Sequence, residues 1–343
     1  MERVGKVILY IVVLILAIGL LIFGARTYND FKFEIKDSNI AEFYKDVTNI
    51  DLYPKSVDGV DIKYVDSKAM QGFHFIPNNK LHNGVVICYG GSEGSPNFEE
   101  AQRLAEEGYE TLAVFLFGMK HQPKTLVRVP LEQFEDVLNY VDENIPGNGP
   151  ITVLGASKGA EYALNLAGKY DRISNIILKA PSAYNFSGLD FDNYGSSWTW
   201  ERKELPYIDI KKSSFPNFIK NVLIPMIVKS PVQFKETYST AIDKDFESYT
   251  KLIPVKELKT NILLIAGEDD KMWDSAGMAN IIKLQNDNVK IAKYKGAGHI
   301  FAGDGILNTV DMRMKVGGTL EANNEAAEES NKEIDDFLRQ YHN

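Results

Sequence analysis

The pentapeptide at 155–159 (GASKG) is the part of the chain best suited to chemistry. An apolar run at 151–154 precedes it and predicts a buried strand, and a helical pattern of small and apolar residues follows from Ala160. A serine between two glycines, on a sharp turn from strand to helix, exposes its hydroxyl as a nucleophile. The start of a helix also favours the negative charge that develops on an attacked carbonyl. We therefore predict that Ser157 is a catalytic nucleophile.

A serine nucleophile needs a general base, which is usually a histidine. Only His299 follows Ser157 within the body of the chain, directly after an apolar-alternating run at 289–294 and a glycine-containing turn. Such a turn would let the imidazole reach the serine, so we predict that His299 is the base; a surface-loop histidine is the alternative. The remaining histidines precede the serine or end the chain: His74, His82, His121 and His342.

The base in turn needs a carboxylate that orients it. Residues 262–266 are all apolar, as in a strand buried on both faces, and they run into the sequence GEDD at 267–270. Asp270 has the spacing usual for the acid that follows the penultimate strand of such folds, and we predict this role for it. Asp269 and Asp274 are competitors, because an acidic residue here can also line a solvated turn or cap a helix.

The developing oxyanion needs two N–H donors. The first is expected to be the amide of Lys158, the residue after the nucleophile. The second should come from the loop GGSEG at 90–94, which follows a predicted strand at 85–89. We favour Gly91 as this donor, with Ser92 as the alternative. The loop is not a Walker phosphate loop, because the required Gly-Lys-Ser/Thr is absent.

The composition is that of a globular protein, with 343 residues, 44% of them apolar and 25% charged. A formal net charge of -9 without a basic cluster argues against a nucleic-acid partner. No metal-ligand spacing is present, and we expect neither a cofactor nor a metal. The single cysteine, Cys88, cannot form an internal disulfide and is expected to be a small buried side chain.

Residues 7–24 are uncharged and rich in Ile, Leu and Val. As a helix they would span roughly 27 Å, enough for the hydrocarbon core of a bilayer. A cleaved signal peptide is the rival interpretation, although FGA at 23–25 is a poor cleavage site. We predict that residues 1–25 form a membrane anchor and residues 26–55 a juxtamembrane linker, with the following domain outside the cytoplasm.

Residues 56–343 alternate between strand and helix patterns. The first predicted helix begins at Ser95-Pro96 and ends at Gly108, and a second carries an apolar stripe from Leu131 to Val141. A C-terminal helix carries a similar stripe of Ile334, Phe337, Leu338 and Tyr341. The alternation predicts the α/β class, with a mostly parallel central sheet covered by helices on both faces. Together with the serine turn it predicts an α/β-hydrolase fold. The expected strands are 62–65, 71–76, 85–89, 111–115, 151–154, 176–178, 262–266 and 289–294.

One insertion, at about 181–258, interrupts this alternation and is dense in aromatic residues. It lies between two core strands, on the side where strand ends carry active sites, so we predict a cap. The aromatic rings would either line an apolar substrate pocket or pack the core of the cap itself. They are Tyr184, Phe186, Phe191, Tyr194, Trp198, Trp200, Tyr207, Phe215 and Phe218.

From about Val57 onward the chain resembles the catalytic domain of acyl-CoA thioester hydrolases and bile acid-CoA:amino acid N-acyltransferases. The motifs YGGSEG at 89–94, LGASKGAE at 154–161, GEDDKMW at 267–273 and GAGH at 296–299 carry the resemblance. It implies a triad of Ser157, Asp270 and His299. Acyltransferases of that family use cysteine as the nucleophile, so serine implies hydrolysis. The family's N-terminal β-sandwich is replaced here by the apolar segment, and its proline-rich continuation after the histidine by IFAGD at 300–304.

Together these features predict a membrane-anchored serine hydrolase that cleaves an acyl ester or thioester of a small-molecule substrate through an acyl-enzyme. One alternative is acyl transfer to an amine or alcohol. The other is a membrane-tethered binding module that keeps the hydrolase scaffold without catalysis.

Overall fold

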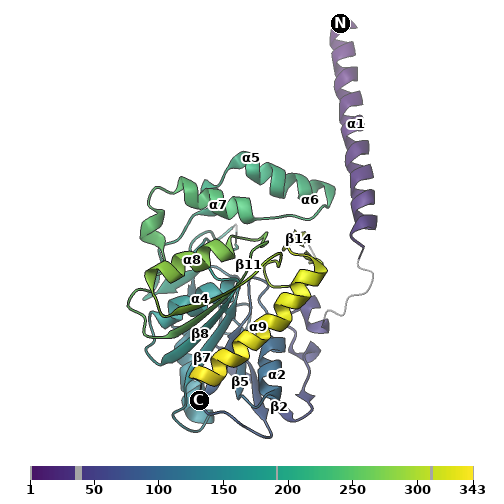
Figure 1. Ribbon diagram of the computed structural model, residues 1–343. Helices are drawn as coiled ribbons and strands as arrows, with labels where there is room; N and C mark the ends of the chain where they lie inside the picture. The colour runs from purple at the N-terminus through teal and green to yellow at the C-terminus, as the bar shows by residue number, and fades with distance from the viewer. Residues whose placement is uncertain (1, 35–40, 191, 310–311, 343) are drawn as a thin grey trace.

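A mixed, mostly parallel sheet forms the centre of the protein, and the computed structural model describes residues 2–34, 41–190, 192–309 and 312–342 (Figure 1). Within these residues nine strands pair in the order β1-β2-β3-β5-β4-β7-β8-β11-β12. The pairs from β1 to β3 and the pair β3–β5 are antiparallel, and the others are parallel. The strands are β1 (Ser56–Val57), β2 (Val60–Ser67), β3 (Met70–Pro77), β4 (Val85–Tyr89), β5 (Thr111–Val114), β7 (Ile151–Ala156), β8 (Ile173–Lys179), β11 (Asn261–Gly267) and β12 (Val289–Tyr294).

Every strand expected from the sequence is present, β4 and β12 with the predicted bounds and the others with slightly different ones, and the predicted fold class is confirmed. The continuous apolar runs arise because the central strands are buried on both faces. In β4, Val85 and Ile87 face one hydrophobic core, whereas Val86 and Cys88 face the other. Cys88 is a free, fully buried thiol, as expected.

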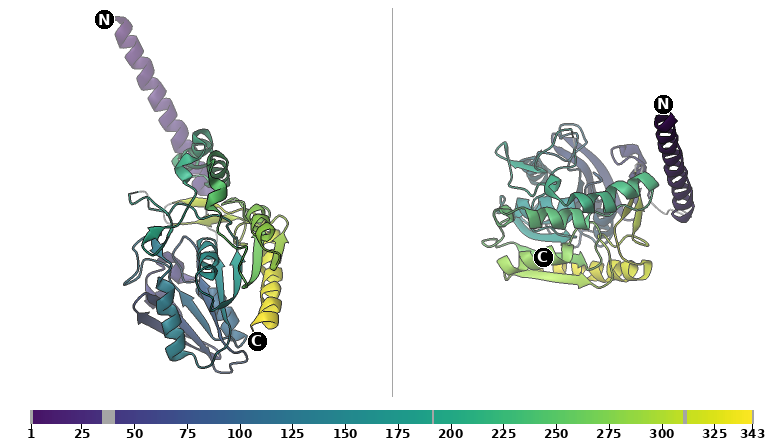
Figure 2. Two further views of the ribbon diagram at one scale, coloured as in Figure 1. Left: turned by 90° about the vertical axis from the view of Figure 1, so that its left-hand side faces the viewer. Right: turned by 90° about the horizontal axis from the view of Figure 1, so that it is seen from above.

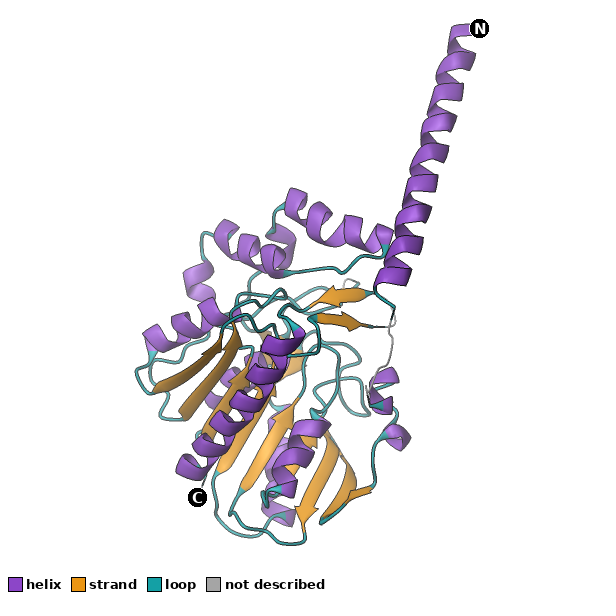
Figure 3. Ribbon diagram, turned by 45° about the vertical axis from the view of Figure 1, so that its right-hand side comes forward, coloured by secondary structure: helices purple, strands orange, loops and turns teal. Residues whose placement is uncertain are grey.

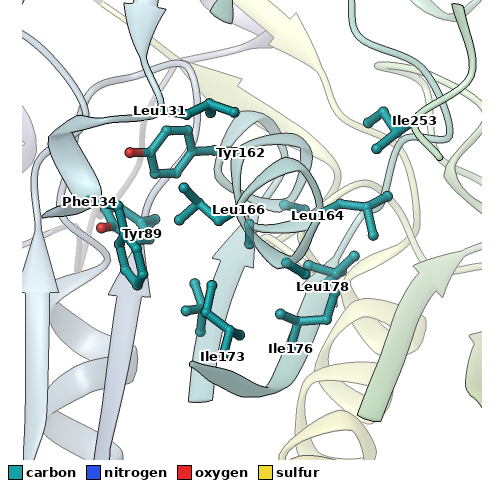
Figure 4. Close-up of a cluster of buried hydrophobic side chains, with 14 of the residues drawn as sticks. Tyr89, Leu131, Phe134, Tyr162, Leu164, Leu166, Ile173, Ile176, Leu178 and Ile253 are labelled. Carbon is teal, nitrogen blue, oxygen red and sulfur yellow. The ribbon is translucent and has the colours of Figure 1, made fainter. Parts of the chain in front are cut away.

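Helices cover both faces of the sheet (Figures 1 and 3). On one face pack α3 (Gln133–Asn144), α4 (Lys158–Ala167) and α8 (Ser275–Gln285), and on the other α2 (Phe98–Glu106) and α9 (Leu320–Tyr341). Figure 4 shows the first core, where Leu164 and Leu166 of α4 lie near Ile176 and Leu178 of β8. This packing fixes the start of α4, and therefore Ser157, at the carboxyl end of the parallel strands.

Two predicted helix starts differ from the structure. Helix α2 begins at Phe98 rather than at Ser95-Pro96, because the Ser95 hydroxyl donates to Glu93 Oε1 (2.6 Å) instead of capping a helix. The residue before the helix, Asn97, is left-handed with φ 59°. Gly108 follows the end of α2 as expected, with φ 89°. Helix α3 begins after Leu131, which was predicted on its stripe.

The N-terminal helix α1 (Glu2–Lys32) is longer than the apolar run and is almost wholly exposed. It is long and apolar enough to cross a membrane, a property that signal sequences share. Met1 and residues 35–40 lie outside the described residues.

Part of the segment predicted as a linker packs onto the domain. It forms two short turns, η1 (Glu42–Lys45) and η2 (Ile50–Leu52). Phe43 and Tyr53 are buried there, with ring centroids 4.4 Å apart, and both pack against Phe98 of α2. Their burial ties residues 41–55 to the core, which a flexible linker would not do.

The aromatic insertion forms a layer over the carboxyl ends of the strands, between β8 and β11 (Figure 1). In its described part β9 (Trp198–Trp200) and β10 (Lys203–Glu204) form a three-stranded sheet with β6 (Val129–Pro130). Trp198 is fully buried against Tyr162 of α4, while Phe191 lies outside the described residues. The helical elements are η3 (Ile210–Lys212), α5 (Phe215–Phe218), η4 (Ile219–Leu223), α6 (Ile224–Val228), α7 (Lys235–Lys244) and η5 (Ser248–Lys251); a hairpin of β13 (Ile306–Asn308) and β14 (Arg313–Lys315) lies beside them.

Candidate active site

The turn between β7 and α4 holds Ser157 in a strained conformation, with φ 54° and ψ −115°. Close backbone approaches explain the two flanking glycines. A Cβ at Gly155 would lie 2.2 Å from the carbonyl oxygen of Gly159, and a Cβ at Gly159 would lie 2.2 Å from that of Gly90. Both positions therefore exclude a side chain, and the strained turn presents the serine side chain at the carboxyl edge of the sheet.

The structure brings the predicted nucleophile, base and acid into one hydrogen-bonded chain. His299 Nε2 lies 2.8 Å from Ser157 Oγ, and His299 Nδ1 lies 2.8 Å from Asp270 Oδ2. The other carboxylate oxygen, Asp270 Oδ1, accepts from the amides of Met272 (2.8 Å) and Trp273 (3.1 Å). Asp270 and His299 are only 1% and 5% exposed, so their contact is shielded from water.

The competing acids bind other partners. Asp269 pairs with Lys271 at 2.6 Å and accepts from the amide of Gly318 at 3.0 Å. Partial burial would raise its pKa, but these contacts outweigh that effect and hold the pKa below its usual value. Asp274 precedes α8 and pairs with Lys235 at 2.9 Å.

Two of the other histidines also have partners of their own. His74 lies 2.8 Å from Glu110, and His342 Nδ1 lies 2.7 Å from Thr152 Oγ1. Neither therefore takes the position that His299 occupies beside Ser157.

An aromatic cluster surrounds His299 and joins the cap to the site. Trp273, from the loop that carries Asp270, packs edge-on against His299 with ring centroids 5.3 Å apart. Phe186 and Tyr238 of the cap pack against Trp273 at 5.9 and 5.6 Å. Sequence reasoning did not assign Trp273 a role, although the motif GEDDKMW contained it.

The two candidate oxyanion donors differ in their surroundings. Lys158 begins α4, where the first N–H groups of a helix have no intrahelical acceptor. Gly91 lies beside the nucleophile, because a Cβ placed on it would be 3.3 Å from Ser157 Cβ. Its amide, however, donates to Glu93 Oε1 at 3.0 Å, so it already has an acceptor in this structure. Ser92, the alternative, is exposed in the same loop.

Most of the chain matches a known protein family. A family model described as BAAT / Acyl-CoA thioester hydrolase C terminal matches residues 129–343. The chain belongs to this family. The resemblance noted in the sequence is thereby confirmed for more than half of the chain. Ser157, Asp270 and His299 all lie within the matched region.

Individual members of the BAAT / acyl-CoA thioester hydrolase family are distant in sequence. Mouse bile acid-CoA:amino acid N-acyltransferase is 27% identical over 297 residues, which cover 82% of this chain and 66% of that protein. Human acyl-coenzyme A thioesterase 1 is 25% identical over 225 residues, covering 65% and 48%. The chain therefore spans between about half and two thirds of the length of these relatives.

A solved structure supports the fold alone. An esterase from Pyrococcus furiosus superposes with a TM-score of 0.50 at 15% identity, over 83% of this chain and 92% of that one.

The family motif LGASKGAE contains a buried ion pair behind the nucleophile. Lys158 Nζ lies 2.8 Å from Glu161 Oε2 and donates to Ser197 Oγ at 2.8 Å. Glu161 Oε1 accepts from Trp198 Nε1 (2.8 Å) and from the amide of Phe186 (3.0 Å). Burial lowers the pKa of Lys158 and raises that of Glu161, against the attraction between them. The pair thus ties the cap to the residue that follows Ser157, a role that the sequence did not reveal.

A surface cavity of about 950 Å³ lies away from this chemistry. It is lined by the C-terminal part of α4 and by residues such as Leu205 and Leu252, and it contains none of the three hydrogen-bonded residues of the site. Among the described residues no three His, Cys, Asp or Glu side chains are grouped as metal ligands.

Proposed function

We propose that the protein is a serine hydrolase that cleaves an acyl ester or acyl thioester through an acyl-enzyme. The continuous chain from Ser157 Oγ through His299 to Asp270 is the observation that supports this most strongly. With Nδ1–H donated to Asp270, the Nε2 atom of His299 is left to accept the serine proton.

In the proposed reaction Ser157 Oγ attacks the acyl carbonyl while His299 takes its proton. The amide of Lys158 and a second amide, from Gly91 or Ser92, stabilise the oxyanion. His299 then returns the proton to the leaving alcohol or thiol, and the Ser157 ester forms. Water, deprotonated by His299, attacks this ester, and the acid is released as the serine proton returns.

We also propose that α1 anchors the protein in a membrane with the catalytic domain outside the cytoplasm. The exposed apolar length of α1 supports an anchor. A protease added to intact cells should then digest the domain, whereas protection of the domain would contradict this orientation.

Acyl transfer is the second candidate, because relatives named N-acyltransferases are among those that match. Purified protein should be given acyl-CoA thioesters and aryl esters of graded chain length, with and without glycine, taurine or short alcohols. Hydrolysis predicts free acid as the main product under all these conditions, at a rate that Ser157→Ala abolishes. Acyl-glycine, acyl-taurine or a new ester as the main product would instead identify a transferase.

A further inference from the structure

The cap presents an apolar surface that the described part of the chain leaves exposed. Residues 210–229, here called the interfacial segment, contain η3 and a continuous helical stretch through α5, η4 and α6. On its inner side Asn221 and Val222 are buried, and Asn221 Oδ1 accepts from Gln233 Nε2 at 3.1 Å. Its outer side exposes large apolar side chains, namely Phe215 (68% exposed), Phe218, Leu223, Ile224 (51%), Met226 and Ile227 (41%).

The interfacial segment also carries exposed lysines. They are Lys211, Lys212, Lys220 and Lys229. A helix with large apolar side chains on one side and lysines around them is the pattern of segments that lie in a membrane surface, with the lysines toward anionic headgroups.

Contacts with α1 fix where this surface lies relative to the candidate membrane span. Asn29 Nδ2 donates to the carbonyl oxygen of Val228 at 2.8 Å. Asp30 pairs with Lys229 and with Arg313 of β14, each at 2.9 Å. The end of α6 is therefore attached to the C-terminal turns of α1, and both views in Figure 2 show α5 and α6 beside the base of this helix.

The depth of this attachment matches a membrane interface. Asn29 follows the uncharged run 7–24 by five residues, which is roughly 8 Å along a helix. Interfacial helices insert their apolar face to about 5–10 Å, at the boundary between headgroups and acyl chains. In Figure 1 the interfacial segment runs across the top of the domain, at a large angle to α1, as a helix in the membrane plane would.

We propose that the interfacial segment lies in the surface of the same bilayer that α1 crosses, with its apolar side chains inserted and Lys220 against anionic headgroups. The protein then has two membrane contacts, and the cap faces the lipid. The chain that follows the segment reaches the loop that carries Asp270, since the amides of Phe234 and Lys235 both donate to the carbonyl oxygen of Lys271 at 3.0 Å. If the proposed hydrolase function holds, this arrangement favours acyl substrates that arrive from the bilayer.

The test uses the full chain in vesicles and does not depend on activity. The native cysteine, Cys88, is fully buried, so a thiol-reactive, environment-sensitive fluorophore can be attached to introduced cysteines. Ile224→Cys and Ile227→Cys report on the interfacial segment. Leu284→Cys, at an 86% exposed position on α8, is the matched control. Each labelled protein is placed in phosphatidylcholine vesicles containing phosphatidylglycerol and nitroxide lipids.

The proposal predicts blue-shifted emission and strong nitroxide quenching at positions 224 and 227, and neither at 284. Lys220→Glu should weaken the quenching at 224 in phosphatidylglycerol vesicles, whereas no weakening would overturn the role of anionic headgroups. Water-like emission at 224 and 227 would overturn the membrane contact. A blue shift without lipid quenching would also overturn it, because it would show that a second copy or another protein covers the segment.

Discussion

The carboxylate of Glu93 accepts a hydrogen bond from the amide of Gly91, the residue on which a Cβ would lie 3.3 Å from the Cβ of Ser157, the proposed nucleophile. Glu93 also accepts from the hydroxyl of Ser95, so its carboxylate links two other residues of the same loop. If Gly91 is the second oxyanion donor, a substrate must displace this carboxylate before the amide can act.

Glu93→Gln should therefore raise kcat/KM for a small ester several-fold, because a neutral amide competes less for the Gly91 N–H and does not repel the oxyanion. Steady-state kinetics on the purified protein measure this, with the exposed Glu99→Gln as the control. A fall of about a hundredfold or more, comparable with loss of an oxyanion donor, would show that Glu93 holds the loop in place and would favour Ser92 as the donor.

The assignment of the acid predicts unequal effects of neighbouring substitutions. Asp270→Asn should lower kcat by roughly four orders of magnitude, since the wrong tautomer of His299 would then be held. Asp269→Asn should change kcat only slightly, because Asp269 contacts Lys271 and Gly318 instead. Equal losses in the two variants, or the reverse order, would move the role to Asp269.

The buried ion pair of Lys158 and Glu161 predicts that removing one charge destabilises the protein more than removing both. Glu161→Gln leaves the Lys158 ammonium buried without its counter-ion, which typically costs about 3–5 kcal/mol of unfolding free energy. The double variant Lys158→Met/Glu161→Gln removes both charges and should recover much of that loss. Thermal unfolding of the wild type and both variants measures these stabilities. A double variant less stable than Glu161→Gln would show that the unpaired buried charge is not the cause of the loss.

The pH dependence of stability should contain a contribution from His342. Burial, together with the nearby charge of His82, lowers its pKa from 6.5 to about 4. Because the native pKa is the lower one, the unfolded chain binds the proton more readily. The stabilisation is complete above pH 6.5 and is lost as the pH falls toward 4. Each tenfold difference in proton affinity between the native and unfolded states is worth about 1.4 kcal/mol of unfolding free energy.

His342→Gln should flatten the decline of the melting temperature in this pH range, whereas His121→Gln, at an exposed position, should leave it unchanged. An unaltered decline in His342→Gln would show that other groups cause it.

The strands, and the positions of Ser157, Asp270 and His299 just after three of them, could be predicted from the sequence, because each depends on local patterns. Buried parallel strands produce apolar runs, and the glycines beside the serine report close backbone contacts. The predicted start of α2 was wrong. Serine is a residue type that often caps helices, but the Ser95 hydroxyl donates to Glu93, and only the folded loop brings these two side chains together.

Contacts between distant segments were the least predictable. Trp198 was expected either to line a pocket or to pack the cap, and its indole instead donates to Glu161 across the cap boundary. The occupied amide of Gly91 depends on a side-chain rotamer of Glu93, which no sequence pattern specifies. The exposed side of α5 and α6 likewise becomes evident only once the opposite side is packed.

The most direct measurement is the site of reaction with a fluorophosphonate probe, which modifies a serine only when its hydroxyl is activated. Purified wild-type protein should be labelled, and peptide mass spectrometry should place the adduct on Ser157. Ser157→Ala should lose the label and its activity while keeping the wild-type melting temperature, and His299→Ala should label far more slowly. An adduct on another residue, or a folded Ser157→Ala variant with near wild-type turnover, would contradict the proposed nucleophile.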